Sequence, residues 1–328
     1  MSAPSSLLGR VVTIATGRPA YIEMAWNLAR SFLHWNGDGS LRFTLCTDHA
    51  GPLPADLVDV EIVRIRPGEC GAGFSPKLHL DRLVPSNAPV LFLDADCLVV
   101  APLRPVFDRL RGRDFSLIGR MTEVGEFYGD VRSHLARAGV PRLPLFVGSL
   151  MYWENGDTAR SVFASARAFE SRYDELGISR MRGATADEPV VALAFGAHGL
   201  EPVSDDGTIK ADAHLYDYPP EIDLFRGRVR FVNTAPAGSH VIPNPLRESR
   251  PAIAHFNAAY AFESPYLREA LVLRLVRLHG WPPFAARAWA LLSLDWPQRL
   301  VQGLKNLLRP AYRRLFGTRT IKPTPRET

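Results

Sequence analysis

The sequence predicts an α/β fold, a mostly parallel twisted sheet with helices on both faces, followed by a helical, amphipathic tail at the C-terminus. Three observations support this prediction. Short apolar runs alternate with amphipathic stretches through the N-terminal third of the chain, as they do in repeated strand–helix–strand units. Val90-Leu91-Phe92-Leu93 is apolar on both faces, which is typical of a buried strand in a parallel sheet. Beyond Tyr266, leucines recur at helical spacing beside basic residues, which indicates an amphipathic helix.

The first third of the chain is expected to form strand–helix–strand units that lead to a strand with two acids at its end. The predicted elements are a strand at 10–17, a helix at 21–35, strands at 41–46 and 59–65, a helix at 77–83 and a strand at 90–93. Ile22, Ala25 and Ala29 support the first helix because they recur at helical spacing. The first strand ends in the small-residue turn Thr16-Gly17.

The second half of the chain is less regular. Its predicted elements are strands at 115–119 and 145–153, helices at 157–172 and 187–194, and a strand at 252–256. Asp157 is expected to cap the helix that it begins. The segment 216–244 is rich in proline and glycine, so we expect it to run over the surface near the site.

Composition limits the class of protein. Of the 328 residues, 46% are hydrophobic, enough for a sizeable core. The net charge of +5 arises from the tail, so it gives no indication of a nucleic-acid partner. We therefore expect a nucleotide-binding body at 1–265 and a basic, aromatic tail at 266–328. The cysteines are few and lack metal-site spacing, residues 1–10 show no signal-peptide pattern, and no apolar run approaches the ~18 residues of a membrane span. These features predict a cytoplasmic protein.

Two acids, Asp94 and Asp96, follow the buried strand directly. In open α/β sheets, ligands bind beyond the carboxyl ends of the strands. If the strand geometry continued, both side chains would project from one side, and Ala95 is small enough to let a ligand approach. Two carboxylates at this spacing suit Mg²⁺ or Mn²⁺ carrying substrate phosphates. The alternative is an acidic turn that lies in water.

The order of the motifs resembles the GT-A glycosyltransferases, and most closely glycosyltransferase family 8. The resemblance rests on Thr16-Gly17, on Lys77-Leu78-His79, on Leu93-Asp94-Ala95-Asp96 and on His255 far downstream. It implies transfer of a sugar from a nucleotide-sugar, usually a UDP-sugar, to a glycan or glycolipid acceptor, with retention at the anomeric carbon. It further implies that Asp94, Asp96 and His255 bind Mn²⁺ (or Mg²⁺). The alternative for His255 is a core histidine whose nitrogens are satisfied.

The resemblance also assigns the donor-binding residues. Ala15 and Thr16 correspond to backbone contacts with the nucleobase and ribose, Lys77 corresponds to a lysine that contacts the donor, and Ala95 lies between the two metal-binding acids. An ordinary surface cation is the alternative for Lys77. The chain departs from the family at Val147-Gly148-Ser149, where an asparagine is usual, and after His255, where a lysine is usual. Arg247 or Arg250 is a candidate replacement for that lysine.

Asp187 and Glu188 resemble the Asp-Gln pair that the family carries near the acceptor side of the sugar, with Glu188 at the glutamine position. A carboxylate there can stabilise an oxocarbenium-like transition state or act as a nucleophile. The alternative is that both are acids of a helix N-terminus, favoured by the helix dipole.

The basic tail has the composition of a helix that binds anionic membranes. Leu300, Leu304, Leu307 and Leu308 fall on one helical face, with cations beside or opposite them. The sequence therefore predicts association with the cytoplasmic face of a membrane. The resemblance to family 8, which includes bacterial lipopolysaccharide glycosyltransferases, implies a role in cell-envelope polysaccharide or lipopolysaccharide synthesis. Packing of this helix on the body is the alternative. Two other functions stay open: a nucleotidyltransferase of similar sheet architecture, and a catalytically degenerate GT-A domain that serves as a membrane-associated scaffold.

Overall fold

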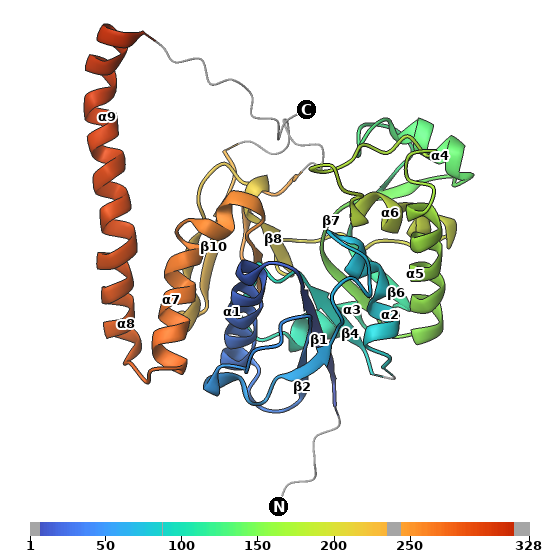
Figure 1. Ribbon diagram of the computed structural model, residues 1–328, viewed down its shortest axis with the longest axis horizontal. Coiled ribbons are helices and arrows are strands. Elements are labelled where there is room, and N and C mark those ends of the chain that lie inside the picture. Colours follow the sequence, from blue (N-terminus) through green and yellow to red (C-terminus); the bar gives the residue numbers. More distant parts are fainter. Residues whose placement is uncertain (1–6, 87, 235–243, 318–328) are drawn as a thin grey trace, which may run out of the picture.

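A six-stranded sheet forms the centre of the computed structural model, which describes residues 7–86, 88–234 and 244–317 (Figure 1). The strand order is β3-β2-β1-β4-β7-β6. The bounds are β1 Gly9–Ala15, β2 Leu41–Thr47, β3 Glu61–Arg64, β4 Val90–Leu93, β6 Phe115–Thr122 and β7 Leu143–Trp153. Strands β1, β2, β3 and β4 are mutually parallel, and β7 runs antiparallel to both of its neighbours. The predicted mostly parallel α/β sheet is confirmed.

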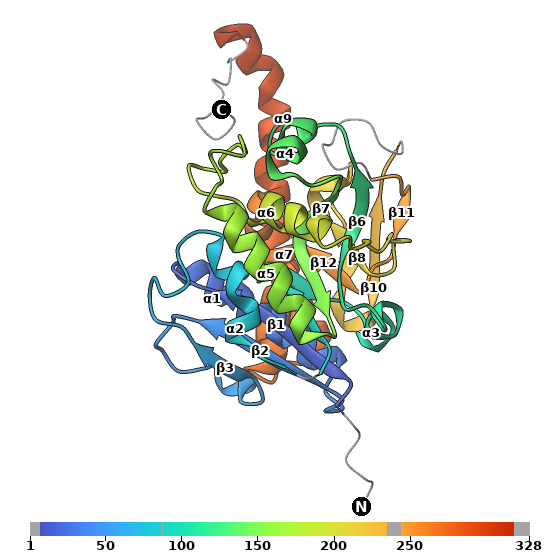
Figure 2. The same cartoon turned by 90° about the vertical axis from the view of Figure 1, so that its right-hand side faces the viewer.

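Strand β4 is buried on both faces, as its uninterrupted apolar sequence predicts. Val90 and Phe92 pack into one hydrophobic cluster, and Leu91 and Leu93 pack into a second cluster on the opposite face. The first cluster contains residues of α5 Gly156–Glu170 and α6 Asp187–Ala197. The second contains residues of α1 Pro19–Trp35 and α3 Arg104–Leu110. Helices therefore cover both faces of the sheet, as expected (Figure 2).

The remaining short helices are α2 Leu80–Leu83 and α4 Val131–Ala138. Lys77 lies in a 3-10 helix, Ser75–His79, and not in the α-helix predicted at 77–83. Pro76 near its start favours this local turn. The predicted cap of α5 was also wrong: Asn155 accepts hydrogen bonds from the amides of Asp157 and Thr158, so the N-cap lies two residues upstream of Asp157.

Two small sheets flank the main one. The first joins β5 Cys97–Val99, β12 Ile253–His255 and β8 Lys210–Asp212, with β12 in the middle. The second joins β9 Glu221–Asp223, β10 Arg228–Val232 and β11 Glu248–Ser249. The segment predicted to cross the surface at 216–244 thus contributes two strands, and its residues 235–243 lie outside the described part of the chain. The first small sheet is the one that brings distant residues to the site.

The chain ends in helices α7 Tyr266–Arg277, α8 Pro283–Ala290 and α9 Trp296–Phe316, with a turn of π-helix at Leu291–Asp295. Helix α7 packs on the body through Tyr266, Ala270 and Leu273. Between α7 and α8, the buried Glu269 accepts hydrogen bonds from Arg268 and Arg287. The predicted division at 265 stays a prediction, and residues 318–328 lie outside the described part of the chain.

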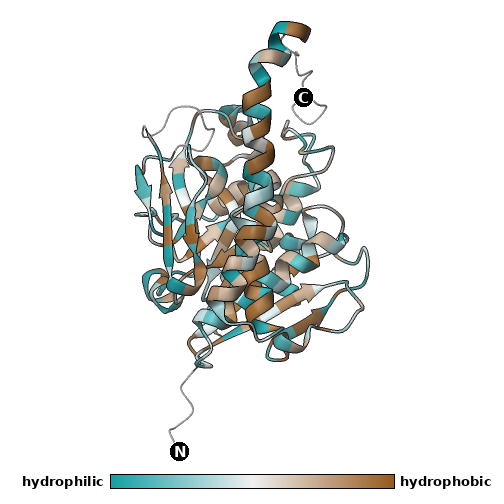
Figure 3. Cartoon of the chain, turned by 90° about the vertical axis from the view of Figure 1, so that its left-hand side faces the viewer, coloured by the Kyte–Doolittle hydropathy of each residue, from teal (hydrophilic) through white to brown (hydrophobic). Residues whose placement is uncertain are grey.

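Helix α9 extends away from the body (Figure 1) and carries an apolar stripe on its surface (Figure 3). Its exposed apolar side chains include Leu300, Val301, Leu304, Leu307, Leu308 and Leu315. The predicted C-terminal amphipathic helix is therefore present. In the described part of the chain, every helix is too short or too polar to pass through a lipid bilayer.

Candidate functional site

The paired acids lie in a tight turn directly beyond β4. The Asp94 amide donates to the carbonyl of Ser149, and the Cys97 amide donates to the carbonyl of Asp94. These bonds reverse the chain from β4 into β5, so Asp94 and Asp96 do not continue the strand geometry on which the sequence argument relied. Both side chains remain accessible, at 19% and 22%. Each acid nevertheless faces the carboxyl edge of the sheet, where a ligand is expected.

Asp96 meets His255 at this edge. Strand β12 pairs antiparallel with β5, and the register places His255 opposite Cys97. His255 Nε2 lies 3.2 Å from Asp96 Oδ1. The ligand atoms of Asp96, Cys97 and His255 all lie within 4.8 Å of one another. The structure thus brings together two of the three predicted metal ligands, Asp96 and His255, from distant parts of the chain.

Asp94, the third predicted ligand, faces Lys77. The Lys77 ammonium lies 2.8 Å from Asp94 Oδ1 and 3.0 Å from Oδ2. The same ammonium lies 3.2 Å from Asp187 Oδ2. Burial alone would lower the pKa of Lys77, but Asp187 and Asp94 raise it above its ordinary value. Lys77 is therefore a charged, largely buried link between the two groups of acids, and not the surface cation that was the alternative.

Asp187 and Glu188 begin α6, and both are held inside the site. Glu188 Oε2 accepts a hydrogen bond from Tyr128 Oη at 2.6 Å, and Oε1 accepts one from the Gly148 amide at 2.7 Å. Burial and the neighbouring Asp187 raise the pKa of Glu188. Both acids lie in the first turn of α6, the position that the alternative assigned to them. Their fixed orientation toward Lys77 and Gly148 goes beyond that role.

Sequence reasoning missed a buried cluster behind His255. His255 Nδ1 lies 2.7 Å from Asp212 Oδ1, and Lys210 Nζ lies 3.1 Å from each oxygen of Asp212. Burial alone would lower the pKa of His255, but Asp96 and Asp212 raise it to about 10. The only sequence signal for Asp212 is a pair of charged residues, Lys210 and Asp212, in an otherwise apolar run.

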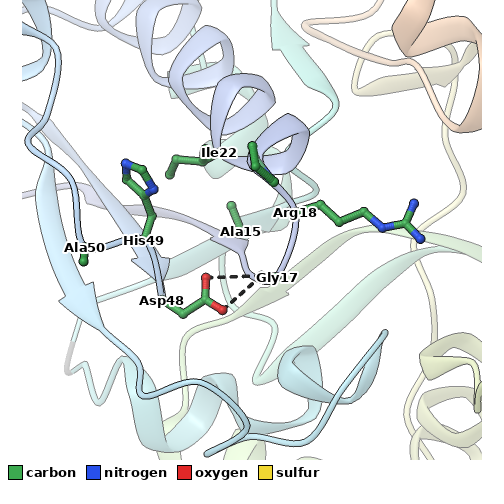
Figure 4. Close-up of a pocket in the computed structure, with 8 residues that line it drawn as sticks. Ala15, Gly17, Arg18, Ile22, Asp48, His49 and Ala50 are labelled. Carbon is green, nitrogen blue, oxygen red and sulfur yellow. Dashed lines mark hydrogen bonds between the residues drawn. The ribbon is translucent and has the colours of Figure 1, made fainter.

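A cavity of about 260 Å³ opens at the carboxyl ends of β1 and β2 (Figure 4). Ala15, Gly17, Asp48 and His49 line it, and the Gly17 amide donates to both oxygens of Asp48, at 3.0 and 3.2 Å. Gly17 adopts a φ of 82°, which glycine reaches without strain. Ala15 was predicted to lie at the donor site, as was its neighbour Thr16. The sequence explains Asp48 equally well as a solvated turn after the second strand, and His49 was missed.

The donor atoms at the carboxyl edge suit a divalent cation. Asp96 offers carboxylate oxygen, His255 offers an imidazole nitrogen that points toward it, and Asp94 supplies a further carboxylate in the same turn. Oxygen with one imidazole is a set that Mn²⁺ accepts more readily than Ca²⁺. Because the Asp96 and His255 atoms already converge, the residues fit such a group.

Comparison with solved structures identifies the fold. The galactosyltransferase LgtC, solved with donor and acceptor sugar analogues, matches with a TM-score of 0.51 and 14% identity, over 87% of this chain and 96% of LgtC. The glycosyltransferase GlyE of Streptococcus pneumoniae matches with a TM-score of 0.50 and 14% identity, over 83% of this chain and 63% of GlyE. The bifunctional glycosyltransferase WbbM matches at 0.50 and 11%, over 83% of this chain and 50% of WbbM.

These likenesses show a fold of the GT-A type, shared with glycosyltransferases similar to family 8. The resemblance that the sequence motifs indicated is therefore confirmed at the level of fold. This chain spans about half to two thirds of the length of GlyE and WbbM, and nearly all of LgtC. No protein-family model matches the sequence, and no curated protein is similar to it in sequence.

Proposed function

We propose that this chain is a metal-dependent, retaining glycosyltransferase that moves a sugar from a UDP-sugar to a glycan or glycolipid acceptor. One observation carries the proposal: Lys77 joins Asp94 of the metal-binding turn to the buried acid Asp187. A site that transfers a sugar from a diphosphate needs positive charge for the leaving group and negative charge for the sugar ring. The contacts of Lys77 with Asp94 and Asp187 support this proposal, because they bring charges of both signs together at the sheet edge.

The leaving group gains negative charge as the glycosidic bond breaks. Asp96 and His255 would hold Mn²⁺ (or Mg²⁺), with Asp94 as a further ligand. Such a cation stabilises the charge on a diphosphate. Lys77 is within reach of the same turn, so its ammonium supplies a second positive charge for the donor phosphates. The cavity lined by Ala15 and Gly17, on either side of Thr16, is the proposed site of the nucleoside, which backbone groups at the end of β1 would contact.

Asp187 and Glu188 would face the sugar ring, where an oxocarbenium-like transition state carries positive charge. Glu188 is fixed by two hydrogen-bond donors, Tyr128 and the Gly148 amide. A fixed carboxylate stabilises such charge without the reorganisation that water would need. We propose this electrostatic role for Glu188, with Asp187 held beside it by Lys77.

Titration calorimetry with UDP, with and without Mn²⁺, tests the nucleotide and metal assignments together. We expect UDP to bind with Mn²⁺ and to bind much more weakly without it. A screen of nucleotide-sugars for released UDP then identifies the donor. Asp96→Ala should abolish release with little loss of fold. Asp206→Ala is the matched control, since Asp206 is an exposed acid that pairs with Arg109 far from the turn.

Two outcomes would redirect the assignment. A fold without metal-dependent UDP binding would favour the catalytically degenerate scaffold. Release of pyrophosphate from a nucleoside triphosphate, in place of UDP from a nucleotide-sugar, would favour the nucleotidyltransferase. Transfer that survives in Asp96→Ala would show that the metal assignment is wrong.

We further propose that α9 binds an anionic membrane surface at the cytoplasmic face, which would present glycolipid acceptors. Its leucines are exposed, and Lys305, Arg309, Arg313 and Arg314 lie on the same helix. An amphipathic helix with this charge favours anionic interfaces. Removal of residues 296–328 should abolish sedimentation with anionic vesicles and leave UDP release intact, since Asp295 and the buried ion pairs behind it remain. Unchanged sedimentation would contradict the proposal.

A further inference from the structure

We propose that Asp212 is a positioning residue that orients His255 for metal binding, an inference that rests on the metal site of the proposed function. Asp212 is the last residue of β8, and the parallel register of β8 and β12 places it directly beside His255. Both side chains are buried, with 6% and 3% of their surfaces exposed. They are 43 positions apart in the sequence, so this contact depends on the pairing of β8 with β12.

The contact determines which ring nitrogen faces the metal turn. Nδ1 of His255 lies 2.7 Å from the Asp212 carboxylate, and Nε2 lies 3.2 Å from Asp96. A carboxylate accepts a hydrogen bond and cannot donate one, so Asp212 holds the proton on Nδ1. Nε2 is then the nitrogen that releases its proton and offers a lone pair when a cation binds. Histidine ligands in proteins are commonly oriented in this way by a carboxylate behind them.

Asp212 is itself held by two further residues, Ser149 and Lys210, which share its Oδ1 with His255. Ser149 Oγ donates to Oδ1 at 3.2 Å, and the Lys210 ammonium lies 3.1 Å from each carboxylate oxygen. Lys210 also donates to Ser149 Oγ at 2.8 Å and to the Val147 carbonyl at 3.3 Å. The carboxylate cannot rotate away from His255 without losing these bonds. The Lys210 ammonium further stabilises its charged form.

A purely structural role for the Lys210–Asp212 pair makes a different prediction. A buried ion pair that only joins β8 to β7 would affect folding and leave metal affinity unchanged in variants that fold. Positioning of His255 predicts the converse, a loss of metal affinity in a folded protein. The two roles therefore differ in a measurement that does not depend on transfer activity.

The experiment measures Mn²⁺ affinity by electron paramagnetic resonance of the free ion, in the full-length protein without donor. We expect Asp212→Asn to weaken Mn²⁺ binding by roughly 10- to 100-fold, the usual effect of losing such a partner. Asp206→Asn is the matched control, an exposed acid in the loop before β8 whose loss should leave the affinity unchanged. Thermal unfolding of each variant shows whether it is folded.

Removing a negative charge also weakens cation binding by electrostatics alone, and it leaves Lys210 buried without its partner. The double variant Lys210→Met, Asp212→Asn corrects for both effects, because it removes one charge of each sign. We expect it to fold and still to bind Mn²⁺ at least tenfold more weakly than the wild-type protein. An affinity within twofold of the wild type in this double variant would overturn the inference.

His255→Gln separates failure of the inference from failure of the proposed function. If His255→Gln weakens Mn²⁺ binding and neither Asp212 variant does, the inference alone is wrong. If His255→Gln has no effect, the metal site itself is wrong. A nitrogen–proton NMR spectrum of the wild-type protein loaded with diamagnetic Zn²⁺ needs no variant: we expect the His255 proton on Nδ1, and a proton on Nε2 would overturn the inference.

Discussion

A single methyl group added at Gly148 should greatly reduce activity in a protein that still folds. A Cβ added there would lie 2.8 Å from Glu188 Cγ, 3.1 Å from Asp187 Oδ2 and 3.3 Å from Glu188 Oε1. Gly148 lies in the buried strand β7 and not among the glycines with positive φ, so alanine meets no backbone strain. The effect of Gly148→Ala is therefore steric and falls on the two acids.

The size of the effect follows from these distances. Carbon atoms pack at ~3.5–4.0 Å, so Glu188 must retreat by about 1 Å. Tyr128 and the Gly148 amide hold its two oxygens, so the retreat strains or breaks a hydrogen bond. Misplacing a catalytic group by about 1 Å costs on the order of 100-fold in rate. Overpacking of a buried strand costs about 1–3 kcal/mol of unfolding free energy.

The assay compares UDP release and urea unfolding in Gly148→Ala with those in Gly303→Ala. Gly303 lies in α9 with open space around it, so alanine there should stabilise the helix slightly and leave the rate unchanged. In a Glu188→Ala background, which lacks the Cγ that clashes, the added methyl should cost much less stability. A wild-type rate and stability in Gly148→Ala would refute the reasoning, because the acids would then not occupy the positions described.

Further predictions concern the pH dependence of stability, the reactivity of the cysteines and the ion pairs between α7 and α8. Burial raises the pKa of Cys46 to about 12, whereas an unfolded thiol titrates near ~8.5. The stabilisation from burying the protonated thiol is fully present below the unfolded pKa and is lost as the pH rises toward 12. The free energy of unfolding of the wild type should therefore fall more steeply with pH than that of Cys46→Ala over this range, by at most ~1.4 kcal/mol per pH unit. Equal slopes in urea unfolding would contradict this. Ellman's reagent should detect no thiol at pH 8 in the native protein, because every cysteine is buried: Cys46, Cys70 and Cys97. Glu269→Ala should destabilise the protein by about 3 kcal/mol in urea unfolding, since it leaves two partly buried guanidinium groups, those of Arg268 and Arg287, short of a partner. A loss below ~1 kcal/mol would show that other acids compensate.

The parts of the site that follow a strand directly could be predicted from the sequence. The apolar run at 90–93 fixed the position of the turn that carries Asp94 and Asp96, because its burial on both faces follows from its composition. Lys77 and His255 were found through motif order. Their contacts were not, since the spacing of two acids does not reveal that one faces a lysine and the other a histidine.

The contacts missed by sequence reasoning all join residues far apart in the chain. Tyr128 reaches Glu188 across 60 positions, from a loop residue with a φ of 57°. Asp212 reaches His255 only after β12 has paired with both β5 and β8. No local sequence pattern around Tyr128 or Asp212 indicates which residue it contacts. Three-dimensional packing determines both contacts, and the one between Asp212 and His255 depends on strand pairing in the small sheet.

Strand β7 contacts the turn beyond β4, the cluster beside His255 and the acids of α6, which lie in separate segments of the sequence. The Ser149 carbonyl accepts from the Asp94 amide in the turn beyond β4, and the Ser149 hydroxyl donates to Asp212 beside His255. The Gly148 amide bonds to Glu188, and the Val147 carbonyl accepts from Lys210. A shift of this strand would therefore move the turn, the histidine and the acids together. The chain departs from the family motif at residues 147–149, yet these residues still hold the parts of the site in position. They do so through backbone groups and the Ser149 hydroxyl, while the Val147 side chain is buried in apolar surroundings.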